Sequence, residues 1–388
     1  MGFLVKRLAM RFRYLLSDQH GDIELCAEDL EQPFLISPTE KHPFLTLADY
    51  FGALQQFIML HVENKILSVF KVNHPLTDIS EIIIRSEKHG AFYHIASIEI
   101  SGTAEHIKLA VTSALSESAR KSLAEEYCIL QQLSAINSDL IPQIYSKKSV
   151  IWETGSGSEK FLMVSGEWLD GYHEWHLSED AKSGDSKIHL WDYAKGYRFL
   201  SDAESYEMLR QVAYILTFYY DQTSFCQVYP WHHGAGDFVV KAETVGAISV
   251  KLITARQYDP LVQFDRAEEA DRLIATIHFL LNLSLRIRLD RLDGVGEPAW
   301  LDEFAVDAAI AGFFAGLAAT QAEDRLLIGP AEEFLEILQS FDAREIYDMY
   351  ESLLEIYAGE DQDDFHLIQE KLADHAAELY KTLQNFSL

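Results

Sequence analysis

Residues 229–240 read YPWHHGAGDFVV, a stretch in which aromatic residues, adjacent histidines and an aspartate crowd into an irregular loop. The segment before it, Ser201 to Tyr220, has apolar residues at helical spacing and is predicted to be a helix. After it, Phe238 to Lys241 and Ala247 to Ile253 are short apolar runs around a turn at Gly246, which predicts a hairpin. Rigid elements on both sides make this loop a place where polar groups can converge on a ligand.

Upstream of that helix, the sequence changes to partly alternating apolar and polar residues. This pattern predicts strands over residues 81–85, 92–100, 107–114, 140–145 and 160–165. A helix is predicted between the third and fourth strands, at Ser116 to Leu133. We therefore expect an α+β protein in which these strands form one antiparallel sheet, with the helix packed on one side.

The pattern divides the chain into four segments. Residues 1–75 are predicted to be an N-terminal helical extension around a helix from Leu45 to Val62. Residues 76–167 form a β-rich lobe, and residues 168–329 form a helical lobe that carries the loop and the hairpin. Residues 330–388 form an acidic helical tail. Helices after the hairpin are expected over residues 267–291, 302–321, 331–358 and 362–386.

The charge of the chain limits its partners. Its 388 residues include 32 Lys and Arg against 61 Asp and Glu, so the formal net charge is −29. Residues 297–388 hold 21 acidic and 4 basic side chains, which accounts for −17 of that total. A field of this sign repels phosphate backbones and anionic lipids, so nucleic-acid binding is not expected. The partner is expected to be a small-molecule ligand or another protein.

Cysteine usage and hydropathy bear on location. Cys26, Cys128 and Cys226 lie far apart and form no CxxC pair, so neither a disulfide scaffold nor a cysteine zinc site is expected. The longest apolar stretch, Phe304 to Ala319, is interrupted by Asp307 and is interpreted as a buried helix, so no transmembrane segment is predicted. A cytoplasmic location fits these features best.

The order of elements over about residues 80–320 resembles the protein-kinase-like superfamily, including its aminoglycoside and choline phosphotransferase branch. The resemblance implies a two-lobed fold with an antiparallel five-stranded N-lobe and a mainly helical C-lobe, binding ATP with Mg²⁺. The third strand has Thr112 at the position of the superfamily's lysine, and Lys108 lies four residues earlier. By the resemblance, Glu125 and Glu126 on the following helix stand where the superfamily keeps the glutamate that pairs with its lysine. The nucleotide site would then include Lys108, Glu125, and Glu167 and Asp170 in the hinge.

The loop itself departs from the superfamily. His232 stands where the resemblance places the catalytic aspartate, and Asp237 stands at the metal-binding position. Thr254 replaces the magnesium-binding aspartate after the hairpin. Either the register is shifted and Asp259 or Asp265 serves as the metal ligand, or these substitutions indicate a degenerate kinase that binds a nucleotide or small metabolite. Phosphotransfer to a small molecule is a possible activity. Alternatively, His232, His233 and Asp237 form a redeployed site that holds a transition metal or supplies acid and base.

Residues 232–237 also match the string HHxxxD, which resembles the motif of chloramphenicol-acetyltransferase and condensation-domain acyltransferases. This resemblance implies that His233 is a general base and that Asp237 is structural. Phe238 replaces the glycine that follows the motif's aspartate, and the next residues predict a strand where the motif normally opens a helix. A third hypothesis is a non-catalytic interaction protein that uses its acidic tail.

Three arginines gather in the segment Arg286 to Glu297 of this strongly acidic chain. As a structural feature, the segment is a helix C-terminus whose cations complement the helix dipole and pair with Asp290 and Asp293, with Gly294 as the C-cap. As a functional feature, it is a clamp for an anion or a phosphorylated substrate.

Overall fold

The computed structural model describes residues 11–18, 21–36, 40–63, 79–89, 93–102, 106–181, 183–192, 196–231, 236–243, 246–261 and 269–388. The chain forms two compact units: residues 1–131 with 142–169, and residues 132–141 with 170–388. Both contain helices and strands, so the α+β class is confirmed.

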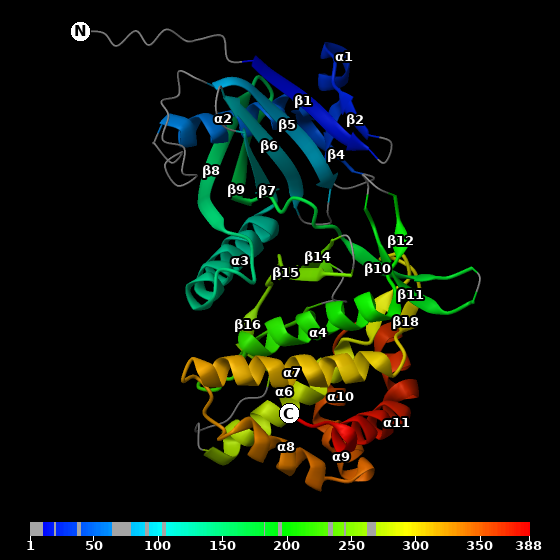
Figure 1. The fold of residues 1–388 in the computed structure, drawn as a ribbon. Coiled ribbons are helices and arrows are strands. Elements are labelled where there is room, and N and C mark those ends of the chain that lie inside the picture. Colours follow the sequence, from blue (N-terminus) through cyan, green and yellow to red (C-terminus); the bar gives the residue numbers. More distant parts are fainter. Residues whose placement is uncertain are drawn as a thin grey trace. The chain divides into compact units, whose positions relative to one another are not determined.

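The first unit is built on one large sheet (Figure 1). Its strands are β1 (Arg11–Asp18), β2 (Gly21–Glu24), β5 (Ile79–His89), β6 (His94–Gly102), β7 (His106–Ala114), β8 (Ile144–Thr154) and β9 (Gly157–Glu167). The remaining elements are α1 (Ala27–Leu30), the paired strands β3 (Pro33–Leu35) and β4 (Lys41–Thr46), α2 (Leu47–Glu63) and α3 (Glu117–Ile136).

The strand order across the sheet is β2-β1-β5-β6-β7-β9-β8. Strands β5, β6, β7 and β9 lie where strands were predicted, but the strand predicted at residues 140–145 shares only its last two residues with β8. Each neighbouring pair among β5 to β9 is antiparallel. However, β1 pairs with β5 in parallel, and β2 adds a further antiparallel strand. The prediction of a five-stranded antiparallel sheet is therefore corrected to a seven-stranded mixed sheet.

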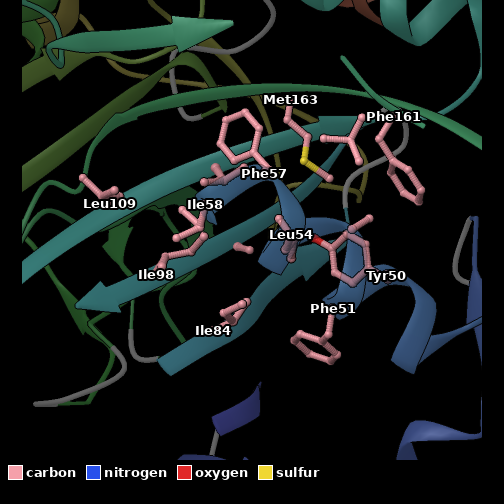
Figure 2. Packing of buried hydrophobic residues seen from close by; sticks show 14 of the residues in the cluster. Tyr50, Phe51, Leu54, Phe57, Ile58, Ile84, Ile98, Leu109, Phe161 and Met163 are labelled. Atoms are coloured by element: carbon pink, nitrogen blue, oxygen red, sulfur yellow. The ribbon is translucent and has the colours of Figure 1, made fainter. Parts of the chain in front are cut away.

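Side chains alternate between the two faces of the sheet, and each face packs against a separate apolar core. On β9, Phe161 and Met163 point into the larger core, while Leu162 and Val164 point into a smaller one on the opposite face. Figure 2 shows α2 filling the larger core with Tyr50, Phe51, Leu54, Phe57 and Ile58. The smaller core receives Ala119 and Leu123 of α3.

The predicted helical extension over residues 1–75 is also corrected. Within this range the described residues form strands β1 to β4 as well as helices α1 and α2. Phe34, Leu45 and Phe51 share a core with Ile82 and Ile98 of the sheet, because their apolar side chains cover one of its faces. The segment is part of the first unit rather than an appendage to it.

The second unit combines small sheets with helices. Its strands pair antiparallel as β10 (Trp175–Glu179), β11 (Ser186–Leu190) and β12 (Arg198–Phe199); β13 (Cys226–Val228) with β16 (Tyr258–Pro260); β14 (Phe238–Ala242) with β15 (Ile248–Leu252); and β17 (Leu289–Arg291) with β18 (Pro298–Trp300). Its helices are α4 (Asp202–Phe218), α6 (Glu269–Arg286), α7 (Phe304–Ala322), α8 (Ala331–Ser340), α9 (Ala343–Met349), α10 (Glu351–Tyr357) and α11 (Gln362–Asn385).

Helices α4 and α7 run side by side in Figure 1 because glycines let their backbones approach closely. A Cβ added at Gly312 of α7 would lie 2.2 Å from the carbonyl oxygen of Arg210. At Gly316 it would lie 2.6 Å from the Cβ of Thr217. Neither position has space for a side chain.

Helix α7 is long and apolar enough to cross a membrane by length and composition alone, and 61% of its apolar window is buried within the protein. Buried residues of α7 include Ile310, Phe313 and Leu317. Burial against neighbouring helices explains why a helix of this composition occurs here, as the interpretation of residues 304–319 expected.

The predicted acidic tail, residues 330–388, is part of the second unit. Its helices bury apolar side chains that include Phe334, Leu353, Leu372 and Leu379. The single predicted helix over 331–358 is three helices, because Asp342 caps α9 with its side chain and Tyr350 separates α9 from α10.

Candidate functional site

The loop that begins at residue 229 follows β13 and precedes β14. Tyr229 and Trp231 are buried at its start. His232 and His233, the predicted catalytic histidines, lie outside the described residues. Asp237, the third predicted catalytic residue and the predicted metal ligand, is described and stands immediately before β14.

Asp237 is fully buried and forms an ion pair with Arg256. The guanidinium Nη1 of Arg256 lies 2.5 Å from one carboxylate oxygen of Asp237 and 2.6 Å from the other. The backbone N–H of Ile253 donates to the carbonyl oxygen of Asp237 at 2.8 Å, which places the end of β15 beside it. A guanidinium of the protein itself therefore contacts both oxygens of the carboxylate that was predicted to bind a metal ion.

Helix α4 holds the hairpin in place through one side chain. The amide of Gln211 donates to the carbonyl oxygen of Ile248 at 2.8 Å and accepts from the N–H of Val250 at 2.9 Å. These bonds satisfy backbone groups of β15 and fix the hairpin against the helix. Sequence reasoning missed both Gln211 and Arg256, since neither belongs to a recognisable local motif.

Lys108 lies on β7 in the first unit and already has a partner. Its Nζ is 3.3 Å from Glu99, the residue opposite it on β6, and 4.3 Å from the ring centre of Trp168. Arg85 also donates to Glu99, at 2.8 Å. Burial acts to raise the pKa of Glu99, but the hydrogen bond and charge of Arg85 outweigh it, so this pKa lies below its usual value.

Glu125 does not join Lys108. Its side chain is 58% exposed and lies 3.9 Å from Lys121 on the same helix. Among the described residues, no ion pair joins Glu125 to Lys108. The helical period explains this placement: Glu126, three residues after the buried Leu123, faces the sheet and is buried, while Glu125 points outward.

The two hinge candidates are placed separately. Glu167 ends β9 in the first unit, and its carboxylate accepts from the backbone N–H of Gln143 at 3.1 Å. Asp170 belongs to the second unit and is exposed in a turn. The contact of Glu167 joins the end of β9 to the residue that precedes β8.

The arginine segment forms ion pairs with the acidic tail, which the sequence analysis did not predict. Arg286 pairs with Glu360, and Arg288 pairs with Glu378. Arg291 lies 2.6 Å from Asp361 and 2.9 Å from Asp364. Acidic side chains of the protein itself thus occupy the positions that an external anion would take.

Gly294 is not the cap of α6, which ends at Arg286. It lies in the turn between β17 and β18 with a φ of +80°, a conformation that favours glycine. A Cβ at this position would also lie 2.7 Å from the imidazole of His176.

Within the part of the chain that the structure describes, no group of three or more His, Cys, Asp or Glu side chains is arranged to hold a metal ion. Asp237 faces a guanidinium, and Thr254 supplies no second carboxylate beside it. Mg²⁺ prefers several oxygen ligands in octahedral geometry, which these described residues do not supply. No protein-family model matches this chain, and no curated protein matches it in sequence.

Proposed function

We propose that this chain is a two-lobed kinase-fold protein with a degenerate active site, which binds a nucleotide or small metabolite without transferring phosphate. The strand order β5-β6-β7-β9-β8, with α3 between β7 and β8 along the chain, supports the N-lobe part of the proposal. A helix, a loop and a hairpin then follow in α4, residues 229–237, and β14 with β15.

The ion pair between Asp237 and Arg256 carries the proposal. Asp237 stands where the resemblance places a metal ligand, and the cation beside it belongs to the protein. A magnesium ion would have to displace a guanidinium bound to both carboxylate oxygens. Phosphotransfer needs a metal to neutralise the charge that develops on the phosphoryl oxygens, and this arrangement opposes metal binding.

Lys108 supports the same conclusion from the first unit. Its ammonium group forms an ion pair with Glu99 and lies over the ring of Trp168, so its charge is partly neutralised by neighbours in the first unit. A lysine in this state attracts a phosphate less strongly than an unpaired one. A phosphotransfer site needs a bound metal ion and a lysine that is available to the phosphates. Here Arg256 contacts the carboxylate at the metal position, and Glu99 pairs with Lys108.

Calorimetry with ATP tests this proposal. We expect the unaltered protein to bind ATP with the same affinity in Mg²⁺ and in EDTA, and to release no phosphate. In Arg256→Gln the affinity should become dependent on Mg²⁺, because Asp237 loses its cation. Arg344→Gln is the matched control, since Arg344 is 88% exposed in a surface pair and should leave binding unchanged.

Two results would contradict the proposal. Transfer of phosphate by the unaltered protein would show that the site is catalytically competent. Absence of ATP binding under both conditions would remove the nucleotide part, and the non-catalytic interaction protein would become the better hypothesis. Location in the cytoplasm is part of the proposal and can be checked by fractionation.

The same ion pair favours an acyltransferase as a second candidate. In the HHxxxD resemblance the aspartate is structural, and a fully buried Asp237 held by Arg256 suits that role. Residues 238–242 form β14 rather than the helix that normally follows the motif, so this candidate ranks second. Acetyl-CoA with a panel of amine and hydroxyl acceptors tests it, and His233→Ala should abolish any acetyl transfer.

A further inference from the structure

The three-stranded sheet of β10, β11 and β12 in the second unit (Figure 1) carries aromatic side chains on one of its faces. His176 pairs with His189 on the neighbouring strand, and His189 pairs with Phe199 on the third. Because directly paired residues point to the same face of a sheet, these three rings form a row across it. The opposite face carries Leu177 and Ile188, which are buried. The row is therefore on the less buried face.

Two further rings extend this row beyond the strands. Trp191 directly follows β11, and its ring centre lies 4.5 Å from that of His176. Tyr197 stacks on Trp191, with 5.8 Å between ring centres and 8° between the ring planes, and lies edge-on to His189 at 5.7 Å. The Tyr197 residue is 47% exposed. We call these five residues the aromatic platform: His176, His189, Trp191, Tyr197 and Phe199.

Ser178 and Asp293 determine which ring nitrogen of His189 carries the proton. The hydroxyl of Ser178 donates to Oδ1 of Asp293 at 2.5 Å, so its oxygen must accept the proton of Nδ1 of His189, 3.2 Å away. Burial lowers the pKa of His189, although the charge of Asp293 acts to raise it, so the imidazole is neutral at pH 7. Nε2 then carries no proton. None of the described residues hydrogen-bonds to Nε2, and this atom is not buried, so it can accept a hydrogen bond from a ligand.

Carboxylates outnumber cations around the aromatic platform. Lys187, two residues before His189, and Arg198, next to Phe199, each donate to a carboxylate at 2.7 Å. The carboxylates whose charge acts on Lys187, Arg198 or His189 are Asp180, Asp185, Asp192, Asp202, Glu204 and Asp293. Six negative charges against two positive ones favour a cationic ligand and repel an anion.

We infer that the aromatic platform binds an arginine side chain of a protein partner, with the guanidinium stacked on Tyr197 and donating to Nε2 of His189. A guanidinium is planar and weakly hydrated, so it stacks on aromatic rings while its N–H groups still donate hydrogen bonds. An ammonium group is compact and strongly hydrated, so it gains less from such a surface. Tyrosine, tryptophan and arginine dominate the binding energy of protein interfaces, which favours a protein as the source of the arginine. This inference goes beyond the proposed function, because no residue of the platform belongs to the loop 229–237.

Titration with the peptide acetyl-Gly-Arg-Gly-Arg-Gly-amide tests this inference, with ¹⁹F NMR of protein labelled with 5-fluorotryptophan as the readout. The chain has six tryptophans, and loss of one resonance in Trp191→Phe assigns the Trp191 signal. We expect the peptide to shift this signal. Tyr197→Ala should raise the dissociation constant about fivefold, because the exposed ring is lost. His189→Phe keeps a ring in the row but has no acceptor, and we expect an increase of similar size.

Three controls separate this site from the general attraction between a cationic peptide and an acidic protein. Tyr197→Phe keeps the ring and should leave the dissociation constant unchanged. Tyr347→Ala removes a tyrosine that is 44% exposed on α9 and precedes Asp348, and it should also leave binding unchanged. A peptide with citrulline in place of both arginines keeps the shape of the side chain without its charge, and should bind at least about fivefold more weakly.

An unshifted Trp191 signal, or unchanged affinity in Tyr197→Ala or His189→Phe, would overturn the inference. Equal losses of affinity in Tyr197→Ala and Tyr347→Ala would also overturn it, because they would show that the peptide binds the acidic surface in general. Equal affinity for the citrulline peptide would exclude a guanidinium ligand. Failure of the protein to bind ATP would contradict the proposed function and would leave this result unaffected.

Discussion

Arg288 donates a hydrogen bond to Nδ1 of His375, with 3.3 Å between the two nitrogens. A guanidinium can only donate, so Nδ1 must be the unprotonated acceptor of this imidazole. The proton is then on Nε2, which lies 2.8 Å from the hydroxyl of Tyr350. The imidazole is fully buried, and burial together with the charge of Arg288 lowers its pKa to about 3.

This pKa predicts a loss of stability on mild acidification. The folded-state pKa of His375 lies below the ordinary value of 6.5, so below about pH 6.5 the unfolded chain takes up a proton that the folded protein does not. The contribution of His375 is complete above pH 6.5 and is lost progressively down to about pH 3. Between pH 7.5 and pH 5 we expect it to lower the free energy of unfolding by about 2 kcal/mol.

Urea unfolding at several pH values measures this effect. The free energy of unfolding should depend less on pH between pH 7.5 and pH 5 in His375→Gln, because the variant has no imidazole to titrate at this position in the unfolded state. An NMR titration in which the His375 resonances move with a midpoint near 6.5 would contradict the prediction.

The start of α4 predicts a second pH effect at lower pH. Ser201 and Glu204 form a capping box, with the Ser201 N–H donating to Glu204 at 2.9 Å. A hydrogen bond from Arg198 is the largest cause that lowers the pKa of Glu204, to about 2. Because the folded pKa lies below the ordinary value of 4.5, the stabilisation is present above about pH 4.5 and is lost as pH falls towards 2.

Ser201→Ala tests the cap at neutral pH. It removes the acceptor for the Glu204 N–H and should lower the free energy of unfolding by about 1 kcal/mol. Ser387→Ala is the control, since Ser387 is exposed beyond the last helix. Equal stability of the two variants in guanidinium unfolding would show that the box contributes nothing.

Local patterns predicted local structure well, as α4 and the hairpin show. The helix predicted at Ser201 to Tyr220 is observed at Asp202–Phe218, and the hairpin strands are observed at 238–242 and 248–252. Strand β1 was missed although a signal was present. Phe12 and Tyr14 alternate with Arg11 and Arg13, and the two aromatic residues pack on the larger core.

The candidate site was less predictable, because its defining contacts join residues far apart in the sequence. Arg256 lies 19 residues after Asp237, and Glu360 lies 74 residues after Arg286. Periodicity reports which face of an element is buried, but it does not report which charges meet across elements. The same limit explains why the ion pairs between the arginine segment and the acidic tail were not predicted.

The contact between α4 and α7 predicts that Gly312→Ala destabilises the protein. In an exposed helix this change would add about 1 kcal/mol of stability. Here the new Cβ would lie 2.2 Å from the carbonyl oxygen of Arg210, so the helices must separate. We expect a net loss of about 2 kcal/mol in urea unfolding.

The control is Ala318→Gly at an exposed position of α7, with a loss of about 1 kcal/mol from helix propensity alone. A stabilised Gly312→Ala protein would rule out the close contact.

The pair of Asp237 and Arg256 predicts an asymmetric double-mutant cycle. The carboxylate is fully buried, whereas the arginine side chain is 42% exposed. Arg256→Gln leaves a buried carboxylate without its cation and should cost about 3 kcal/mol. Asp237→Asn leaves an arginine that can turn towards water and should cost about 1 kcal/mol. The double variant should be more stable than Arg256→Gln alone, because the buried charge has been removed together with its partner.

Urea unfolding at neutral pH measures the free energy of unfolding of all three variants. Equal losses in the two single variants, or strict additivity in the double variant, would show that the carboxylate of Asp237 does not depend on Arg256.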